Sequence, residues 1–92
     1  DEVIHYFQKV NDTTYLIAGR TNLEDMFDEF DINKQNIEYD SNTVSGWIME
    51  QMSKIPKVGD SFLFENVQFT VTKTDHRHIL EVKAEFSNPP KN

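Results

Sequence analysis

Two histidines in the C-terminal part of the chain have a spacing that suits a metal ion. His76 and His78 are separated by one residue, so on a strand both imidazoles would point to the same side and could share a metal. Arg77 lies between them, Asp75 is the nearest carboxylate, and the segment has the composition of a turn. This context favours solvated histidines over a metal site. His5 has no partner in the sequence and is assigned to the outer face of a hairpin.

A second candidate is a row of oxygen-bearing side chains in the middle of the chain. Asp31, Asn33 and Gln35 alternate as the first ligands of an EF-hand loop do. Asn36, however, stands where that loop needs glycine, and Asn42 stands where it needs a bidentate glutamate. The row therefore does not predict an EF-hand.

Acidic residues are concentrated in one segment. The formal net charge of the chain is −7, and residues 21–42 contribute −6 of it, with seven acids against Lys34. Clustered carboxylates can hold Mg²⁺ or Ca²⁺ weakly in the 28–40 segment. The candidates for such binding are Asp28, Asp31 and Asp40. This charge repels phosphate backbones and anionic lipid, so neither nucleic acid nor direct lipid contact is expected, whereas a basic partner is acceptable. The alternative is a solvated helix face that carries no ligand.

Signals for catalysis are missing. The chain has no cysteine, which removes disulfides and thiolate chemistry, and its three glycines form no phosphate-binding loop. Asn11-Asp12-Thr13 matches a glycosylation acceptor, a pattern common by chance. We expect no catalytic, cofactor-binding or dedicated metal-binding residues, and no apolar run approaches the length of a membrane span.

The chain is predicted to begin with a β-hairpin. Residues 3–10 and 13–18 are rich in β-branched and aromatic types. Asn11-Asp12 between them tolerates the backbone of a tight turn. Gly19 is expected to end the second strand where the chain turns away from the sheet.

Two amphipathic helices are predicted next, joined by a long connection over residues 31–42. Thr21 is expected to cap the first helix, with Glu24 as its capping-box partner. The apolar face of this helix is Leu23, Met26, Phe27 and Phe30.

The second helix is expected to begin at the cap Thr43 and to end before Pro56. Its apolar face is Val44, Trp47, Ile48, Met52 and Ile55. Gly46 lowers helix propensity, so we expect it to permit a close approach of this helix to a strand.

The remaining sequence has the two-residue period of antiparallel strands. The inward positions are Phe62 and Phe64, then Val67, Phe69 and Val71, then Leu80, Val82, Ala84 and Phe86. Glu65-Asn66 and residues 75–77 supply the reversals. The predicted fold is an α+β domain of order ββ-αα-βββ, an antiparallel sheet with two helices on one face. Residues 1–86 are expected to form this single domain and residues 87–92 a disordered tail, within a longer protein.

Four fragments, taken in order, resemble a known family. They are Tyr15-Leu16-Ile17-Ala18-Gly19-Arg20 followed by Leu23, then Thr43-Val44-Ser45-Gly46-Trp47-Ile48, then Ile55-Pro56-Lys57-Val58-Gly59-Asp60, then Phe69-Thr70-Val71. Together they resemble the CorC/HlyC transporter-associated domain over about residues 5–86. The family often has aspartate where Ala18 stands, so no role is assigned to that position.

The resemblance implies a fold similar to a subdomain of FAD-binding enzymes of the PCMH type, without enzymatic activity. It implies a place at the cytoplasmic C-terminus of hemolysin-like or magnesium and cobalt efflux proteins, after a membrane domain and a pair of CBS modules, with a role in modulating ion transport. The recurring residues of the family are expected to serve turns and packing. They are Gly19, Arg20, Gly46, Pro56, Gly59 and Asp60.

We therefore expect a non-catalytic regulatory module whose partners are the CBS and membrane domains of its parent or a second copy of itself, with an exposed edge strand as a further docking surface. One alternative is a flavin or adenine nucleotide site in which Arg20 pairs with phosphate and Trp47 stacks on the ring, although Trp47 lies on an apolar face and is favoured as core. The other is direct sensing of divalent cations by the acidic segment.

Overall fold

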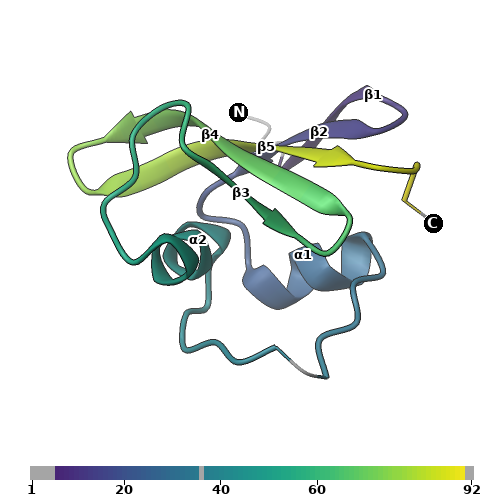
Figure 1. The fold of residues 1–92 in the computed structure, drawn as a ribbon, viewed down its shortest axis with the longest axis horizontal. Helices are drawn as coiled ribbons and strands as arrows, with labels where there is room; N and C mark the ends of the chain where they lie inside the picture. Colours follow the sequence, from purple (N-terminus) through teal and green to yellow (C-terminus); the bar gives the residue numbers. More distant parts are fainter. Residues whose placement is uncertain (1–5, 36, 91–92) are drawn as a thin grey trace, which may run out of the picture.

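The computed structural model describes residues 6–35 and 37–90. The elements are β1 (Phe7–Asn11), β2 (Thr14–Ala18), α1 (Leu23–Glu29), α2 (Val44–Met52), β3 (Ser61–Phe64), β4 (Val67–Asp75) and β5 (His78–Phe86). The five strands form one antiparallel sheet in the order β1-β2-β5-β4-β3. Both helices lie on the same side of this sheet (Figure 1). The predicted α+β fold and its element order are confirmed.

The N-terminal hairpin forms as predicted, with its turn one residue later. Asn11 pairs with Thr14, so Asp12 and Thr13 make the turn. The side chain of Asn11 accepts a hydrogen bond from the Thr13 N–H at 2.9 Å, which fixes this reversal. Residues 3–5 of the predicted strand, including His5, lie outside the described residues.

A single apolar core fills the space between the helices and the sheet. Trp47 on α2 is its centre and is completely buried. Four aromatic rings meet the indole ring edge-on, with centroids 5.2 to 5.7 Å away. They are Phe27, Phe62, Phe64 and Phe69. Such contacts add to the free energy gained from apolar burial, so Trp47 joins α1, α2 and the β3–β4 hairpin.

The cap predicted for α1 was wrong by one residue. Asn22 caps the helix, since its side chain accepts a hydrogen bond from the Asp25 N–H at 3.0 Å. Thr21 cannot take this role because its backbone is held elsewhere: its N–H donates to the Ala18 carbonyl and its carbonyl accepts from Val44 N–H. The Thr21 hydroxyl is buried without a partner among the described residues.

Helix α2 begins as predicted and ends earlier. The Thr43 side chain accepts a hydrogen bond from the Gly46 N–H at 3.1 Å, which confirms the cap. Ser53 adopts a left-handed conformation with φ of 56° and ends the helix, three residues before Pro56. Ile55 therefore leaves the apolar face and is 60% exposed, so its predicted place in the core was wrong.

Two glycines are required by close packing. A Cβ on Gly19 would overlap the carbonyl oxygen of Ile79 in the neighbouring strand β5. A Cβ on Gly46 would lie 2.6 Å from Ser41 Oγ. The expected contact of Gly46 with a strand was therefore wrong, because the close neighbour is the loop that precedes α2.

The alternation of β5 changes phase along the strand. Val82, Ala84 and Phe86 face the core as predicted, but Ile79 is buried and Leu80 is 48% exposed. The register between β4 and β5 shifts on both sides of Lys73, and in the second shift the step from Lys73 to Thr74 in β4 opposes the two steps from Glu81 to Ile79 in β5, so Leu80 is the extra residue of a bulge in β5 itself. Such an irregularity reverses the side that the following residues face, so the predicted inward position of Leu80 was wrong.

Candidate functional site: an acidic loop held by both helices

The connection between the helices is irregular, as predicted, and side chains fasten it at separate points. We use "acidic loop" for its described residues 31–35 and 37–42. The Tyr39 hydroxyl donates a hydrogen bond to Glu24 Oε2 of α1 at 2.9 Å. The Ser41 hydroxyl donates to Glu50 Oε2 of α2 at 2.7 Å. Since a carboxylate from each helix binds the loop, its C-terminal half has a defined position.

Packing adds to these hydrogen bonds. The Tyr39 ring meets the ring of Phe27 with centroids 5.8 Å apart and an interplanar angle of 67°. Ile32 and Ile37 are partly buried against the core cluster. The apolar side chains of the acidic loop therefore contact the protein, while its carboxylates remain at the surface.

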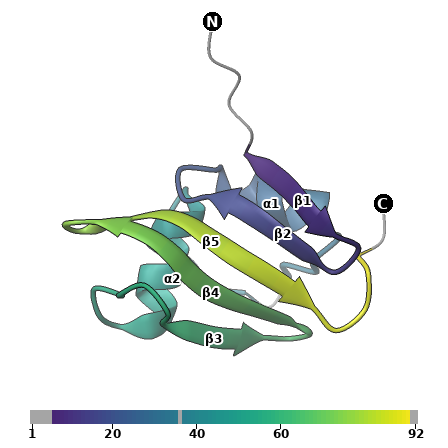
Figure 2. The ribbon, with the colours of Figure 1, turned by 90° about the horizontal axis from the view of Figure 1, so that it is seen from above.

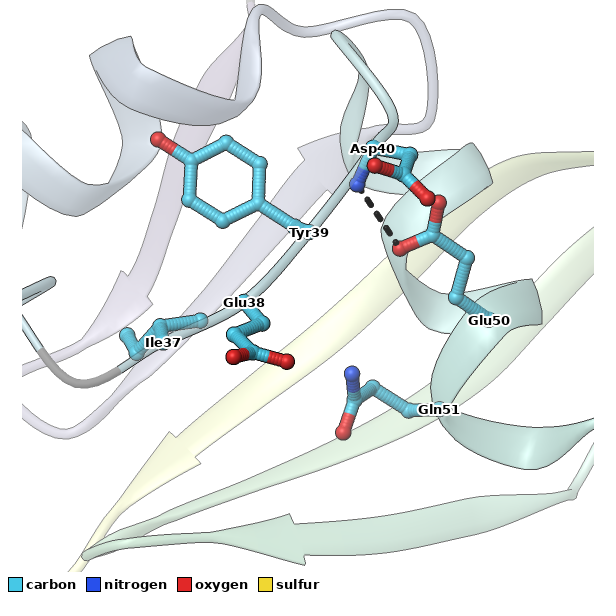
Figure 3. Close-up of a pocket in the computed structure, with 6 residues that line it drawn as sticks. All are labelled: Ile37, Glu38, Tyr39, Asp40, Glu50 and Gln51. Atoms are coloured by element: carbon cyan, nitrogen blue, oxygen red, sulfur yellow. Dashed lines mark hydrogen bonds between the residues drawn. The ribbon is translucent and has the colours of Figure 1, made fainter.

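An open groove of about 650 Å³ lies between the acidic loop and α2. Its lining residues are Ile37, Glu38, Tyr39, Asp40, Glu50 and Gln51. Figure 3 shows the Glu38 carboxylate and the Gln51 amide extending into the gap between loop and helix. At the other end, Asp40 lies beside Glu50, and the Asp40 N–H donates to Glu50 Oε1 at 3.5 Å (Figure 3). Three carboxylates and no basic side chain line this loop groove, so it suits a positively charged partner.

Hydrogen bonds change the ionisation of two groups in the acidic loop. The hydrogen bond to Glu24 raises the pKa of the Tyr39 hydroxyl above its usual value, and desolvation acts in the same direction. The bond from Lys34 Nζ to Asp28, 3.2 Å long, raises the pKa of Lys34. Tyr39 thus stays a hydrogen-bond donor, and Lys34 a cation, throughout the physiological pH range.

The candidate metal ligands of the acidic segment are not brought together. Asp28 pairs with Lys34, and Asp40 lies beside Glu50. Asp31 has a left-handed backbone with φ of 55° just after α1. Among the residues described, no three His, Asp or Glu side chains gather in a way that could hold a metal ion.

The paired histidines lie at the turn between β4 and β5. His76 has a positive φ of 32° in the turn, and His78 begins β5. His78 Nδ1 is 3.7 Å from the Asp75 carboxylate, and both imidazoles are exposed to solvent. This agrees with the preference for solvated turn histidines.

Arg20 and Trp47, the two residues considered for nucleotide binding, differ in their exposure to solvent. Arg20 is exposed, but Trp47 is completely buried and surrounded by aromatic rings. A ligand ring cannot stack on Trp47 in this structure, so its predicted role in the core is confirmed.

Sequence reasoning missed the loop groove, because the pairing of Ser41 with Glu50 and of Tyr39 with Glu24 has no local signature.

The whole architecture matches a family of known domains. The family model described as the CorC/HlyC transporter-associated domain matches residues 8–88. The chain belongs to this family. A transporter-associated domain of a CBS domain protein from Porphyromonas gingivalis is 31% identical in a solved structure, with a TM-score of 0.77 over 90% of this chain and 100% of that one.

Two curated relatives named for transport are longer than this chain. A magnesium and cobalt efflux protein CorC from Pasteurella multocida is 28% identical over 83 residues, which is 90% of this chain and 27% of that protein. A polyamine export protein from Haemophilus influenzae is 31% identical over 77 residues, which is 84% of this chain and 18% of that protein. The transporter-associated domain therefore spans about a quarter or less of these relatives. Within the residues described, no helix combines the length and apolar character that crossing a bilayer needs.

The recurring family positions serve turns and packing in this member. Gly19 lies against β5, Gly46 lies against Ser41, and Pro56 is buried. Gly59 has a φ of 98°, a conformation that other residues rarely adopt. Asp60 closes the same turn: its carboxylate accepts a hydrogen bond from the Lys57 N–H at 2.8 Å and pairs with Lys54. Gly19, Gly46, Pro56, Gly59 and Asp60 thus serve turns and packing as expected, whereas Arg20 is an exposed residue of the turn after β2. The family model is described as a transporter-associated domain.

Proposed function

We propose that this domain is a non-catalytic regulatory module on the cytoplasmic side of a membrane protein that exports cations. The curated relatives named above are an efflux protein for magnesium and cobalt and an export protein for polyamines, whose cargoes share positive charge. Transport itself belongs to the rest of the parent protein, and the present domain adjusts its rate. The arrangement that carries this proposal is an acidic loop held in place by Glu24 and Glu50.

The loop groove and the acidic side of α1 form the proposed docking surface. Residues 21–42 carry a charge of −6, and the hydrogen bonds of Tyr39 and Ser41 hold the C-terminal half of the acidic loop in place. A fixed surface loses less conformational entropy on binding than a flexible one. We propose that the partner is a basic surface of the CBS pair or membrane domain of the same parent chain. Attraction between opposite charges should weaken as ionic strength rises.

The chemistry of the loop groove supports binding over catalysis. Its side chains are carboxylates, one amide, one phenol and one alkyl group. No nucleophile paired with a base lies among these six residues. The groove is also open, so it does not exclude water from a reaction.

Transport by the full parent protein tests the proposal. Cells lacking their own exporter would carry either the complete parent or a version without residues 6–90, and initial Mg²⁺, Co²⁺ and polyamine efflux would be measured against internal cation concentration. We expect the shortened protein to transport its cargo with an altered concentration dependence. Identical curves would contradict a regulatory role, and abolished transport at equal membrane abundance would make the domain part of the transport machinery.

A further inference from the structure

The two edges of the sheet differ in how they are protected from pairing with another strand. Strand β1 forms one edge and β3 the other (Figure 2). The β1 edge carries Lys9 and an irregular register between Lys9 and Asn11, both of which discourage an added strand. Strand β3 has the sequence Ser-Phe-Leu-Phe, without charge, proline or register shift. The β3 edge therefore lacks these protective features.

The backbone of β3 has hydrogen-bonding groups directed outward. The Val71 N–H of β4 donates to the Asp60 carbonyl at 2.8 Å, and Phe62 then pairs with Phe69. Because bonding direction alternates along an antiparallel strand, residues 60, 62 and 64 face β4, while Ser61 and Leu63 present their N–H and C=O groups to the free edge. An added strand can bond to both residues.

Three of the six exposed large apolar side chains among the described residues lie on β3 or in the segment that leads into it. Leu63 is 70% exposed in the middle of β3. Val58 and Ile55, which are 62% and 60% exposed, lie in the segment that leads into this strand. Figure 2 shows that segment as a loop at the start of β3. An exposed leucine in the middle of an unprotected edge strand offers apolar contact area to an added strand.

The charges that flank β3 are complementary under a two-fold axis. Lys54, Lys57 and Asp60 precede the strand and sum to +1, whereas Glu65 follows it. When two copies of β3 pair antiparallel, the positive end of each strand lies beside Glu65 of the other. A parallel arrangement would instead bring like charges together, which is unfavourable.

We propose that β3 pairs antiparallel with β3 of a second copy of this chain, so that two five-stranded sheets become one continuous sheet. The interface is isologous, with the two Leu63 side chains next to each other near the axis. This inference does not depend on the transport role, because it concerns association of the domain with itself.

Sedimentation velocity of the purified chain over a range of concentrations tests the proposal. We expect a reversible change from the monomer mass to twice that mass. Leu63→Lys should weaken association by about tenfold or more, since each dimer then holds two facing charges. The matched control is Val10→Lys, which places the same charge at a residue 55% exposed on the β1 edge and should leave association unchanged. Circular dichroism and melting curves verify that both variants fold.

Some results would overturn the proposal. They are a monomer at every concentration, a Leu63→Lys variant that associates as the parent does, or loss of association in Val10→Lys. Amide NMR adds a local readout, because the Ser61 and Leu63 N–H groups should gain exchange protection with concentration. Glu65→Lys should weaken the dimer, and adding Lys57→Glu should restore it. Failure of the double variant to recover would contradict the antiparallel arrangement.

Discussion

Gly19→Ala is a demanding test of how the strands and helices are joined. The new Cβ would overlap the Ile79 carbonyl oxygen and lie 2.8 Å from the Ile79 carbonyl carbon, both in the backbone of β5. Side-chain rotation cannot relieve such a contact, so the two strands must separate. Hydrogen bonds cross this point: the Gly19 N–H donates to the Leu80 carbonyl, and the Ser45 N–H donates to the Gly19 carbonyl, each at 2.8 Å. The Ile79 N–H in turn donates to Ser45 Oγ at 3.2 Å.

The cost of Gly19→Ala follows from these contacts. Overpacking costs about 1–3 kcal/mol, and each weakened hydrogen bond costs about 0.5–1.5 kcal/mol. Reduced freedom of the unfolded chain returns about 0.4–1 kcal/mol. We expect a net loss of about 2–4 kcal/mol from a total stability of about 5–14 kcal/mol for a domain of this size. The melting temperature should fall by about 8–30 °C.

Two other glycines serve as controls for Gly19→Ala. Gly59 has open space around its Cβ position but a φ of 98°, so Gly59→Ala should cost only the backbone strain of about 1–2 kcal/mol. Gly46→Ala would place its Cβ 2.6 Å from Ser41 Oγ and 2.7 Å from Ser41 Cβ, so the acidic loop must shift. A gain in helix propensity of about 0.5–1 kcal/mol offsets part of this cost, so the net loss should be smaller than that of Gly19→Ala. Calorimetric and denaturant unfolding measure the stability that each of the three variants loses and so give their order. A Gly19→Ala variant that melts within about 2 °C of the parent would refute the packing described.

Three further predictions concern the core, the acidic loop and the turn before β3. Trp47→Ala should lose about 3–5 kcal/mol in denaturant unfolding because four aromatic contacts disappear, and a parent-like midpoint would contradict the core. The raised pKa of Tyr39 stabilises the fold below the pKa of an unfolded tyrosine, and this contribution is lost as pH rises through the folded pKa; Glu24→Gln should lower that pKa in a spectrophotometric titration. Lys57 and Lys54 lower the pKa of Asp60, so Asp60→Asn should melt below the parent at neutral pH, and the difference should vanish as the pH falls through the folded pKa of Asp60.

The fold could be predicted from sequence because its signals are local and mutually consistent. The period of two in residues 67–71 and 82–86 and the cap at Thr43 each agree with the structure. Errors arose where distant parts of the chain decide. Thr21 and Asn22 are both acceptable caps, and the choice depends on the Thr21 carbonyl bonding to the Val44 N–H. Ile79 replaces Leu80 in the core because β5 carries an extra residue opposite the step from Lys73 to Thr74, an irregularity that has no sequence signature.

The candidate site was predictable only as a charge imbalance. The excess of acid in residues 21–42 is visible in the sequence, but its arrangement is not. The acidic loop lies against α2 because Glu50 binds Ser41 nine positions away, and against α1 because Glu24 binds Tyr39 fifteen positions away. Pairing at such separations depends on the packed helices, so the loop groove follows from the fold and not from a motif.

Efflux by the full parent protein carrying Glu38→Gln together with Asp40→Asn is the most direct measurement of the regulatory role. No hydrogen bond that fastens the acidic loop uses these two carboxylates, since Tyr39, Ser41 and the Asp40 N–H bind Glu24 or Glu50. We predict that the variant protein reaches the membrane, keeps its fold and transports its cargo with a shifted dependence on internal cation concentration. A curve that coincides with that of the parent would contradict the regulatory role assigned to the loop groove.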